Sequence, residues 1–137
     1  MAIRLKRAYE RAAREDGYRV LVDRLWPRGV TKRALALDEW LRDIAPSDAL
    51  RQWFHRGPRR FREFAARYRR ELRREPAAGL LADLAHRARR QRVTLVYSAR
   101  DEKQNQAVVL KRAVERTSPR REKARPRGAP GRARVRE

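Results

Sequence analysis

The sequence predicts an α/β fold: a three-layer sandwich with a small, partly parallel sheet. Two short apolar runs, at residues 18–22 and 93–97, contain β-branched residues and have the length of buried strands. The segments between them repeat apolar residues with the period of a helix. Strands that are buried on both faces and separated by helices imply parallel pairing between helical layers.

The first two strands are expected near the amino terminus. The segment IRLKRAY, residues 3–9, alternates apolar and basic side chains, which is typical of a short, half-exposed strand. The EDG triplet that ends at Gly17 is a turn signal, and the run Tyr18–Val22 then predicts the second strand. Pro27 and Gly29 break the chain after it.

Four helices are expected next. Thr31 can cap the first, in which apolar residues at i, i+3, i+4 and i+7 form one face: Leu37, Trp40, Leu41 and Ile44. Pro46 ends this helix, and Ser47 is a suitable N-cap for a short second helix that carries Leu50, Trp53 and Phe54. Apolar spacing predicts two more helices, at Phe61–Leu72 and at about Ala77–Arg90.

The chain then returns to one strand and one helix. The run Val93–Tyr97 predicts a central strand because it is apolar and β-branched. From about Asp101 the pattern is helical again, with one buried side formed by Ala107, Val108, Leu110 and Val114. The predicted order of elements is ββααααβα.

Composition divides the chain into one domain and a tail. Residues 1–116 are long enough to bury a real core. Residues 117–137 contain eight basic and two acidic residues, together with prolines and glycines, and Val135 is their only sizeable apolar residue. Such a segment cannot bury enough apolar surface to offset the entropy lost on ordering, so a disordered basic tail rich in Arg, Pro and Gly is predicted.

The charge of the chain points to anionic partners. The sequence has 38 basic and 17 acidic residues and a net charge of +21. A charge of this size attracts polyanions, nucleic acid first among them. The alternative is that a GC-rich genome has placed arginine on an ordinary solvated surface.

Several classes of protein are excluded by what the sequence lacks. It has no cysteine, which excludes disulfides, a thiol nucleophile and thiolate metal sites. His55 and His86 lack metal-ligand spacing, and no glycine-rich phosphate loop or hydrolase motif occurs, so neither a metal nor a cofactor is expected. No segment approaches the ~18 apolar residues of a membrane span and no signal peptide is recognisable, so a cytoplasmic protein without a membrane partner is expected.

Polar residues gather after two of the predicted strands. In open α/β sheets, ligands bind beyond the carboxyl ends of the strands. If the two strands are parallel neighbours, the residues that follow them share one edge of the sheet. The candidate ligand-binding residues are therefore Asp23, Arg24, Trp26 and Arg28 after the first strand, and Tyr97, Arg100, Asp101 and Asn105 after the second.

These residue types favour an anionic ligand. Arg24 and Arg28 carry planar guanidinium groups suited to phosphate or carboxylate. A helix that begins near Asp101 would direct unpaired N–H groups to the same edge, with Asn105 on the same face of its first turn. The structural alternatives are that Asp101 only caps the helix, that Arg24 pairs with an internal acid, and that Trp26 is a core side chain.

Five segments, in order, resemble a known bacterial family: DGYRVLVDRLWPRG, ALDEWLRDIAPS, LRQWF, FREFAARYRREL and VTLVYSARDEKQNQAVVL. Over about residues 2–116 they are similar to the YeaO-like branch of the family called domain of unknown function 488. The resemblance implies a compact Rossmann-like α/β domain and no settled activity. It places the family's recurrent positions at Asp23, Arg24, Trp26, Pro27, Arg28 and Gly29, and at Tyr97, Ala99, Asp101, Asn105 and Ala107.

Two stretches depart from the family pattern. Relatives usually read glutamate-histidine-asparagine where this chain has Lys103, Gln104 and Asn105, and Gly-His-Asp-Pro where it has HRGP at residues 55–58. Glutamine forms hydrogen bonds but does not shuttle protons at neutral pH. The departure therefore argues against a histidine-dependent mechanism at the second cluster.

Three functions are compatible with these patterns. The first is binding of a phosphate-bearing or nucleotide-like anion at the strand ends, with or without catalysis by Asp23 and Asp101, although an arginine beside each carboxylate favours an ionised, structural role. The alternative is sequence-nonspecific nucleic-acid binding through the tail and the arginines at 59–70 and 87–92. The third is a structural module whose charges only brace loops. The sequence leaves the oligomeric state open.

Overall fold

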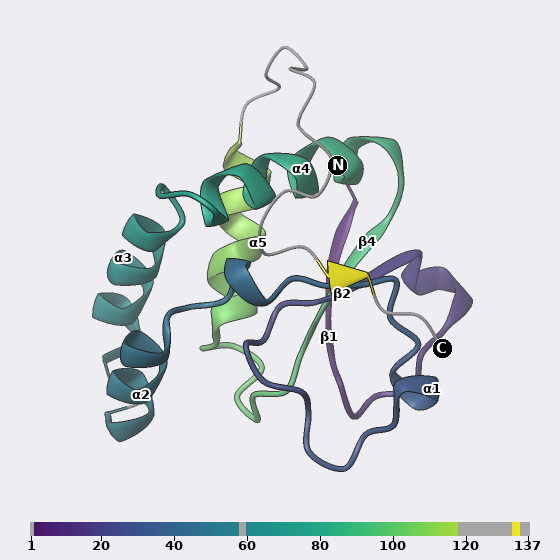
Figure 1. Ribbon diagram of the computed structural model, residues 1–137, viewed down its shortest axis with the longest axis horizontal. Coiled ribbons are helices and arrows are strands. Elements are labelled where there is room, and N and C mark those ends of the chain that lie inside the picture. The colour runs from purple at the N-terminus through teal and green to yellow at the C-terminus, as the bar shows by residue number, and fades with distance from the viewer. Residues whose placement is uncertain (1, 58–59, 118–132, 135–137) are drawn as a thin grey trace.

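The sheet is small and mostly parallel (Figure 1). In this computed structural model, residues 2–57, 60–117 and 133–134 are described. The strands are β1 (Ile3–Arg7), β2 (Tyr18–Leu21), β3 (Glu39–Trp40), β4 (Val93–Tyr97) and β5 (Ala133–Arg134). They lie in the order β1-β4-β2-β3-β5; the first four run parallel, and β5 runs antiparallel to β3. The predicted α/β class with a central strand at 93–97 is confirmed.

Helices cover mainly one face of this sheet. They are α1 (Lys32–Leu35), α2 (Asp48–Arg56), α3 (Phe61–Glu71), α4 (Ala77–Arg90) and α5 (Gln106–Arg116), with 3-10 turns at Arg14–Asp16 and Arg42–Ile44. Helices α2 and α3 form an outer pair beside α4 and α5, whereas α1 lies on the other side of the strands (Figure 1). The predicted tail falls outside the described residues, apart from Thr117 and the two residues of β5.

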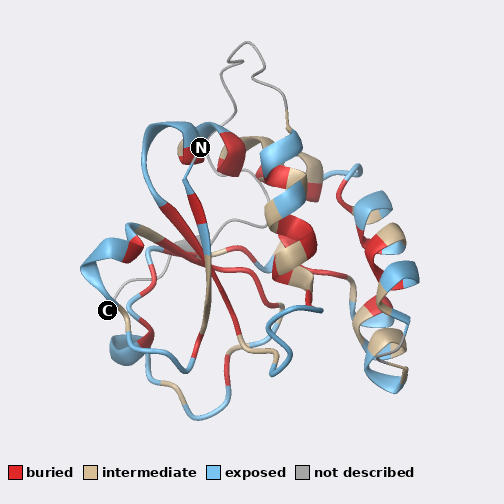
Figure 2. Ribbon diagram, turned by 180° about the vertical axis from the view of Figure 1, so that it is seen from behind, coloured by how far each residue is buried: buried red, intermediate tan, exposed pale blue. Residues whose placement is uncertain are grey.

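Successive side chains of the strands pack alternately into two separate hydrophobic cores. In β2 and just after it, Val20 and Val22 join the large core beneath α3, α4 and α5, whereas Leu21 faces a smaller cluster with Leu35 of α1. In β4, Leu95 belongs to the large core and Val96 to the small one. Figure 2 shows this burial along the strands and on the inner sides of the helices. The two-residue period of a strand therefore builds the three-layer, Rossmann-like arrangement, with a thin layer on the α1 side.

The helix expected from Thr31 to Ile44 is wrong. Thr31 does cap a helix, since its side chain accepts a hydrogen bond from the Ala34 N–H, but α1 has only one turn. Ala36 has a left-handed φ of 45°, and the chain then extends into β3. In β3, Glu39 is buried, and its side chain accepts a hydrogen bond from the Tyr18 hydroxyl (2.9 Å). A strand with a buried acid was read as a helix because the apolar residues around it also fit a helical period.

The expected start of the last helix near Asp101 is also wrong. Helix α5 begins at Gln106, and its N-cap is Asn105, whose side chain accepts a hydrogen bond from the Val108 N–H (3.1 Å). Asp101 instead closes a tight turn by accepting hydrogen bonds from the N–H groups of Lys103 and Gln104. Polar residues at 101–105 therefore form a loop, and the helix begins where the apolar pattern begins.

A buried ion pair connects Arg19 of β2 to Asp16, which precedes that strand. Arg19, 4% exposed, donates to the Asp16 carboxylate (2.6 Å) and, through Nε and Nη2, to the Leu35 carbonyl of α1. Lys6 of β1 donates to the same carboxylate at 3.1 Å. Although burial opposes it, hydrogen bonds from the Ala13 N–H, Lys6 and Arg19 hold the pKa of Asp16 below its ordinary value. This cluster joins β1, β2 and α1.

Candidate functional site at the carboxyl edge of the sheet

The parallel strands bring the two predicted polar clusters to one edge. β2 pairs with β4 in parallel, from Tyr18 opposite Val93 to Leu21 opposite Val96. β1 pairs with the other side of β4. The residues that follow all three strands therefore meet at the carboxyl edge, toward the bottom of Figure 1. The prediction that the two strands are parallel neighbours is confirmed.

Asp23 joins the two clusters directly. Its carboxylate accepts hydrogen bonds from the Ser98 N–H (2.9 Å) and the Ser98 hydroxyl (2.6 Å). The other carboxylate oxygen accepts from the side-chain amide of Gln106 in the first turn of α5. Asp23 is buried, so these contacts fill the space between the ends of β2 and β4 with protein.

The environment of Asp23 favours its neutral form. Burial raises the pKa of this carboxyl group above its ordinary value, and the hydrogen bonds from Ser98 and Gln106 offset only part of that effect. Arg24, the next residue, directs its guanidinium elsewhere. The arginine next to Asp23 in the sequence therefore does not pair with its carboxylate.

The Arg24 side chain at this edge bonds to other parts of the fold. Its Nε donates to the Pro46 carbonyl (3.0 Å) and its Nη2 to the Ala45 carbonyl (3.2 Å), and the Asp43 carboxylate lies 3.8 Å from its Nη1. These contacts tie the loop after β2 to the segment that precedes α2. Two donors of this guanidinium, and its ion pair with Asp43, are therefore used within the fold.

Trp26 also has internal partners. Its indole N–H donates to the Val30 carbonyl (2.7 Å), and its ring meets Trp40 edge-on with centroids 5.4 Å apart. Trp40 in turn donates to the Asp23 carbonyl (2.7 Å). The two tryptophans thus shape the loop after β2 and connect it to β3.

The second cluster is divided between the interior and the surface. Tyr97 and Asn105 are buried, and burial raises the pKa of the Tyr97 hydroxyl, with the charges of Glu102 and Glu10 adding to the effect. Asn105 is used as the cap of α5 and also donates to the Asp101 carbonyl (2.7 Å). Asp101 is exposed, and the N–H groups of the tight turn lower its pKa.

The end of β1 completes the edge. Tyr9 donates its hydroxyl hydrogen bond to the Arg28 carbonyl (3.1 Å). Arg7 lies over the Tyr9 ring, 5.1 Å from its centroid, and donates from Nε to the Ala99 carbonyl (2.9 Å). The loops after β1, β2 and β4 therefore form one connected surface.

The exposed side chains of these connected loops include two large apolar residues and two arginines without side-chain partners among the described residues, beside the exposed acids Glu10, Asp101 and Glu102. Tyr9 and Leu25 are 50% and 58% exposed, unusually high for large apolar side chains in this structure. Arg28 and Arg100 are exposed, and within the described part of the chain neither guanidinium has a hydrogen bond or ion pair assigned to it. We call Tyr9, Leu25, Arg28 and Arg100 the carboxyl-edge surface.

Sequence reasoning missed part of this site. Leu25 gave no signal, since an isolated apolar residue in a loop is ordinary in any sequence. Tyr9 was expected within the first strand, whereas β1 ends at Arg7. Gln106 was missed because its role depends on α5 beginning five residues later than expected. Ser98 lies beside the predicted cluster, and only the geometry shows that both its donors reach Asp23.

Two other features are absent from the part of the chain that the structure describes. None of its helices has the length and apolarity needed to cross a membrane. No group of three or more His, Cys, Asp or Glu side chains is placed there to hold a metal ion.

Comparisons with known proteins identify close relatives. A sequence model described as "Inactive DUF488-N3 subclade" matches residues 2–131, which extends past the boundary near Thr117. A protein of Escherichia coli K12 described as uncharacterised protein YeaO is 48% identical over 111 residues, 80% of this chain and 94% of that protein. A protein of Mycobacterium tuberculosis H37Rv, also described as uncharacterised, is 44% identical over 108 residues, 79% and 89% of the two chains. No solved structure matches.

Proposed function

We propose that this chain, which belongs to the DUF488 family as a YeaO-like member, binds an anionic, phosphate-bearing ligand at the carboxyl-edge surface and does not catalyse a reaction there. The observation that carries this proposal is the presence of Arg28 and Arg100 on loops that β1, β2 and β4 bring together. Exposed guanidinium groups are well suited to phosphate oxygens. Tyr9 and Leu25 add apolar area for the rest of the ligand.

The carboxylates at this edge support binding in preference to catalysis. Asp23 is buried and its oxygens accept hydrogen bonds from Ser98 and Gln106, so a substrate has no approach to it. Asp101 is exposed with a lowered pKa, which suits a permanently ionised turn residue and not a general acid. The description of the matching subclade as inactive agrees with this interpretation.

Inorganic pyrophosphate is a suitable probe of the proposed function. In a thermal-shift titration at constant ionic strength, pyrophosphate should raise the melting temperature of the protein. Arg28→Ala and Arg100→Ala should each weaken its apparent affinity about tenfold, because a charge-assisted hydrogen bond to the anion is removed.

Arg116→Ala is the matched control, since Arg116 is an exposed arginine at the far end of α5. It should bind pyrophosphate like the parent. Equal weakening in all three variants would show attraction to net charge alone and would remove the proposed site.

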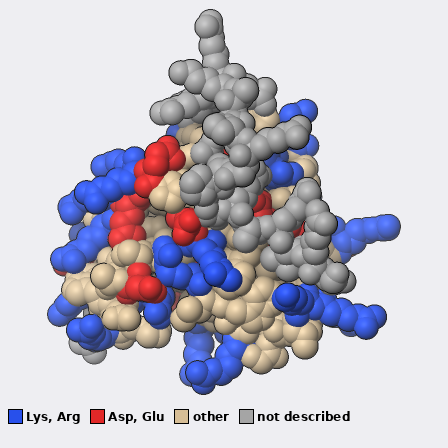
Figure 3. Space-filling view, viewed as in Figure 1, with Lys and Arg blue, Asp and Glu red and all other residues tan. Residues whose placement is uncertain are grey.

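Nucleic-acid binding is a second candidate, favoured by the arginines of α3 and the turn after it. Arg62, Arg69 and Arg73 are exposed, and none of their guanidinium groups has a hydrogen bond or ion pair assigned within the described residues. Figure 3 shows basic side chains along the left of the molecule, over α2 and α3, with acidic ones between them. Such a surface would contact phosphates without reading sequence.

Gel-shift titrations across salt concentration test this candidate. Replacing Arg62, Arg69 and Arg73 together by alanine should weaken binding of a duplex DNA and lower the slope of log K against log salt by about one for each phosphate that the protein no longer neutralises. The control replaces Arg11, Arg14 and Arg33, which are also exposed. An unchanged slope in the α3 variant would count against this candidate.

A further inference from the structure

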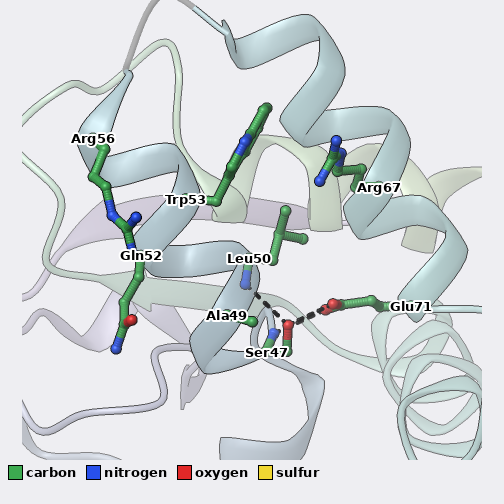
Figure 4. Close-up of a pocket in the computed structure, with 8 residues that line it drawn as sticks. All are labelled: Ser47, Ala49, Leu50, Gln52, Trp53, Arg56, Arg67 and Glu71. Atoms are coloured by element: carbon green, nitrogen blue, oxygen red, sulfur yellow. Dashed lines mark hydrogen bonds between the residues drawn. The ribbon is translucent and has the colours of Figure 1, made fainter.

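A hollow of about 470 Å³ lies between α2 and α3 (Figure 4). Small-molecule sites in proteins have volumes of about 300–1,000 Å³. None of the residues around this hollow belongs to the carboxyl-edge surface: it is lined by Ser47, Ala49, Leu50, Gln52, Trp53, Arg56, Arg67 and Glu71. The lining combines an apolar wall with basic and polar groups, which suits a small molecule that has both kinds of surface.

The two helices that form the hollow are fixed to each other. Phe54 of α2 stacks on Phe64 of α3 with ring centroids 4.3 Å apart. At the floor, the Glu71 carboxylate accepts hydrogen bonds from the Ser47 N–H (2.8 Å) and hydroxyl (2.6 Å), and Ser47 also caps α2. The hollow is therefore preformed, and the Glu71 carboxylate is hydrogen-bonded to Ser47, the N-cap residue of α2.

Trp53 stands in the hollow among arginines. The guanidinium of Arg67 lies 4.4 Å from the Trp53 ring centroid, and that of Arg60 lies 5.1 Å from it. Arg60 comes close because residue 57 is glycine: a Cβ on Gly57 would lie 3.1 Å from the Arg60 Nε. These cation–π contacts help to hold the ring in place.

Several hydrogen-bond donors around the hollow have no assigned partner among the described residues. The indole N–H groups of Trp26 and Trp40 donate to backbone carbonyls, whereas no hydrogen bond is assigned to that of Trp53. Arg56 is exposed and has no assigned ion pair. Arg67 uses its Nη2 on Glu63 (2.5 Å), which leaves Nε and Nη1 available.

We propose that this hollow binds a phosphate monoester of nucleotide size. The phosphate would accept hydrogen bonds from Arg67 and from the Trp53 indole, as guanidinium groups favour phosphate oxygens. Arg56, on the other side of Trp53 in Figure 4, would attract the anion by its charge. The body of the ligand would lie against Leu50 and Trp53. This site is separate from the carboxyl-edge surface and does not depend on the function proposed for it.

The indole N–H resonances of the three tryptophans provide the test. The full-length ¹⁵N-labelled protein is titrated with AMP at constant ionic strength, after each resonance is assigned with a Trp→Phe variant. The Trp53 resonance should shift and saturate. A shift of Trp26 or Trp40, whose indoles are hydrogen-bonded in the loop after β2, would report AMP at the carboxyl-edge surface and not in the hollow.

Three smaller probes separate the parts of the ligand. Ribose 5-phosphate should bind more weakly than AMP, inorganic phosphate more weakly still, and adenosine should give no saturable shift. This order follows because the phosphate supplies the charged contacts and the rest of the ligand supplies apolar contact. Adenosine that binds as well as AMP would overturn the assignment of the arginines.

Arg67→Ala should weaken AMP binding about tenfold, because its charged donors are removed. Arg70→Ala is the matched control, since Arg70 is an exposed arginine of the same helix outside the hollow. If Arg67→Ala disturbs the helix pair, Arg56→Gln at the exposed rim of the hollow tests the contribution of the second cation. The proposal is overturned if Trp53 does not respond to AMP, or if Arg70→Ala loses as much affinity as Arg67→Ala and Arg56→Gln.

The same spectra keep the two proposals apart. Trp26 lies in the loop after β2, so a ligand at the carboxyl-edge surface shifts its resonance and leaves Trp53 unmoved. A response at Trp53 alone supports only the hollow.

Discussion

Arg19→Ala should lower the free energy of unfolding by about 3–5 kcal/mol, the usual result of removing one partner of a buried ion pair. Arg19 is almost fully buried, and its guanidinium serves both the Asp16 carboxylate and the Leu35 carbonyl of α1. Without it, both acceptors lose charged donors in the interior. Urea denaturation followed by circular dichroism measures the change.

Arg4→Ala is the control, since Arg4 is exposed on the neighbouring strand β1. Its effect on stability should stay within about 0.5 kcal/mol. The lowered pKa of Asp16 adds a pH dependence: its contribution to stability is present above the unfolded value of about 3.9 and is lost as the pH falls through the lower folded value. A loss from Arg19→Ala no larger than that from Arg4→Ala would show that the pair does not hold the fold.

Asp23→Ala should lower the free energy of unfolding by about 2–4 kcal/mol, because the buried donors of Ser98 and Gln106 lose their acceptor. Asp23→Asn should cost less, since an amide keeps one accepting oxygen and removes the charge that burial disfavours. Denaturant unfolding of both variants at pH 7 measures this difference. Losses within about 0.5 kcal/mol in both variants would mean that the hydrogen bonds contribute little.

The raised pKa of Asp23 predicts how the difference in stability between the parent protein and Asp23→Asn changes with pH. A carboxyl group whose folded pKa lies above its unfolded value binds its proton more tightly in the folded state. Its contribution to stability is therefore complete below the unfolded value of about 3.9 and is lost as the pH rises through the folded value. The parent should gain stability relative to Asp23→Asn as the pH falls from 7 to 4. A constant difference over this range would contradict the raised pKa.

The strands and long helices were predictable because each has one uninterrupted periodicity. The segment 93–97 is apolar throughout and becomes β4 with the same bounds, and α4 spans Ala77–Arg90 as expected. The prediction of a helix over residues 31–44 was wrong because the apolar pattern there fits both a helix and a strand. The left-handed Ala36 and the tertiary contact of the buried Glu39 decide for the strand. That contact is with a residue far away in the chain.

The candidate site was predictable in position but not in roles. Parallel strands place the residues after β2 and β4 together, which follows from the order of elements. Arg24 is bound within the fold because it donates to the carbonyls of Ala45 and Pro46, a contact that the sequence does not indicate. Arg24 therefore serves the scaffold, and Arg28, four residues later, is exposed to solvent.

The central claim, that an anion binds at the carboxyl-edge surface, is tested most directly by mapping amide shifts of the full ¹⁵N-labelled chain during titration with pyrophosphate. The account predicts saturable shifts centred on Tyr9, Leu25, Arg28 and Arg100, absent in an Arg28→Ala, Arg100→Ala double variant. Shifts that spread over exposed arginines on every face, or that stay near the amino ends of the strands, would contradict it.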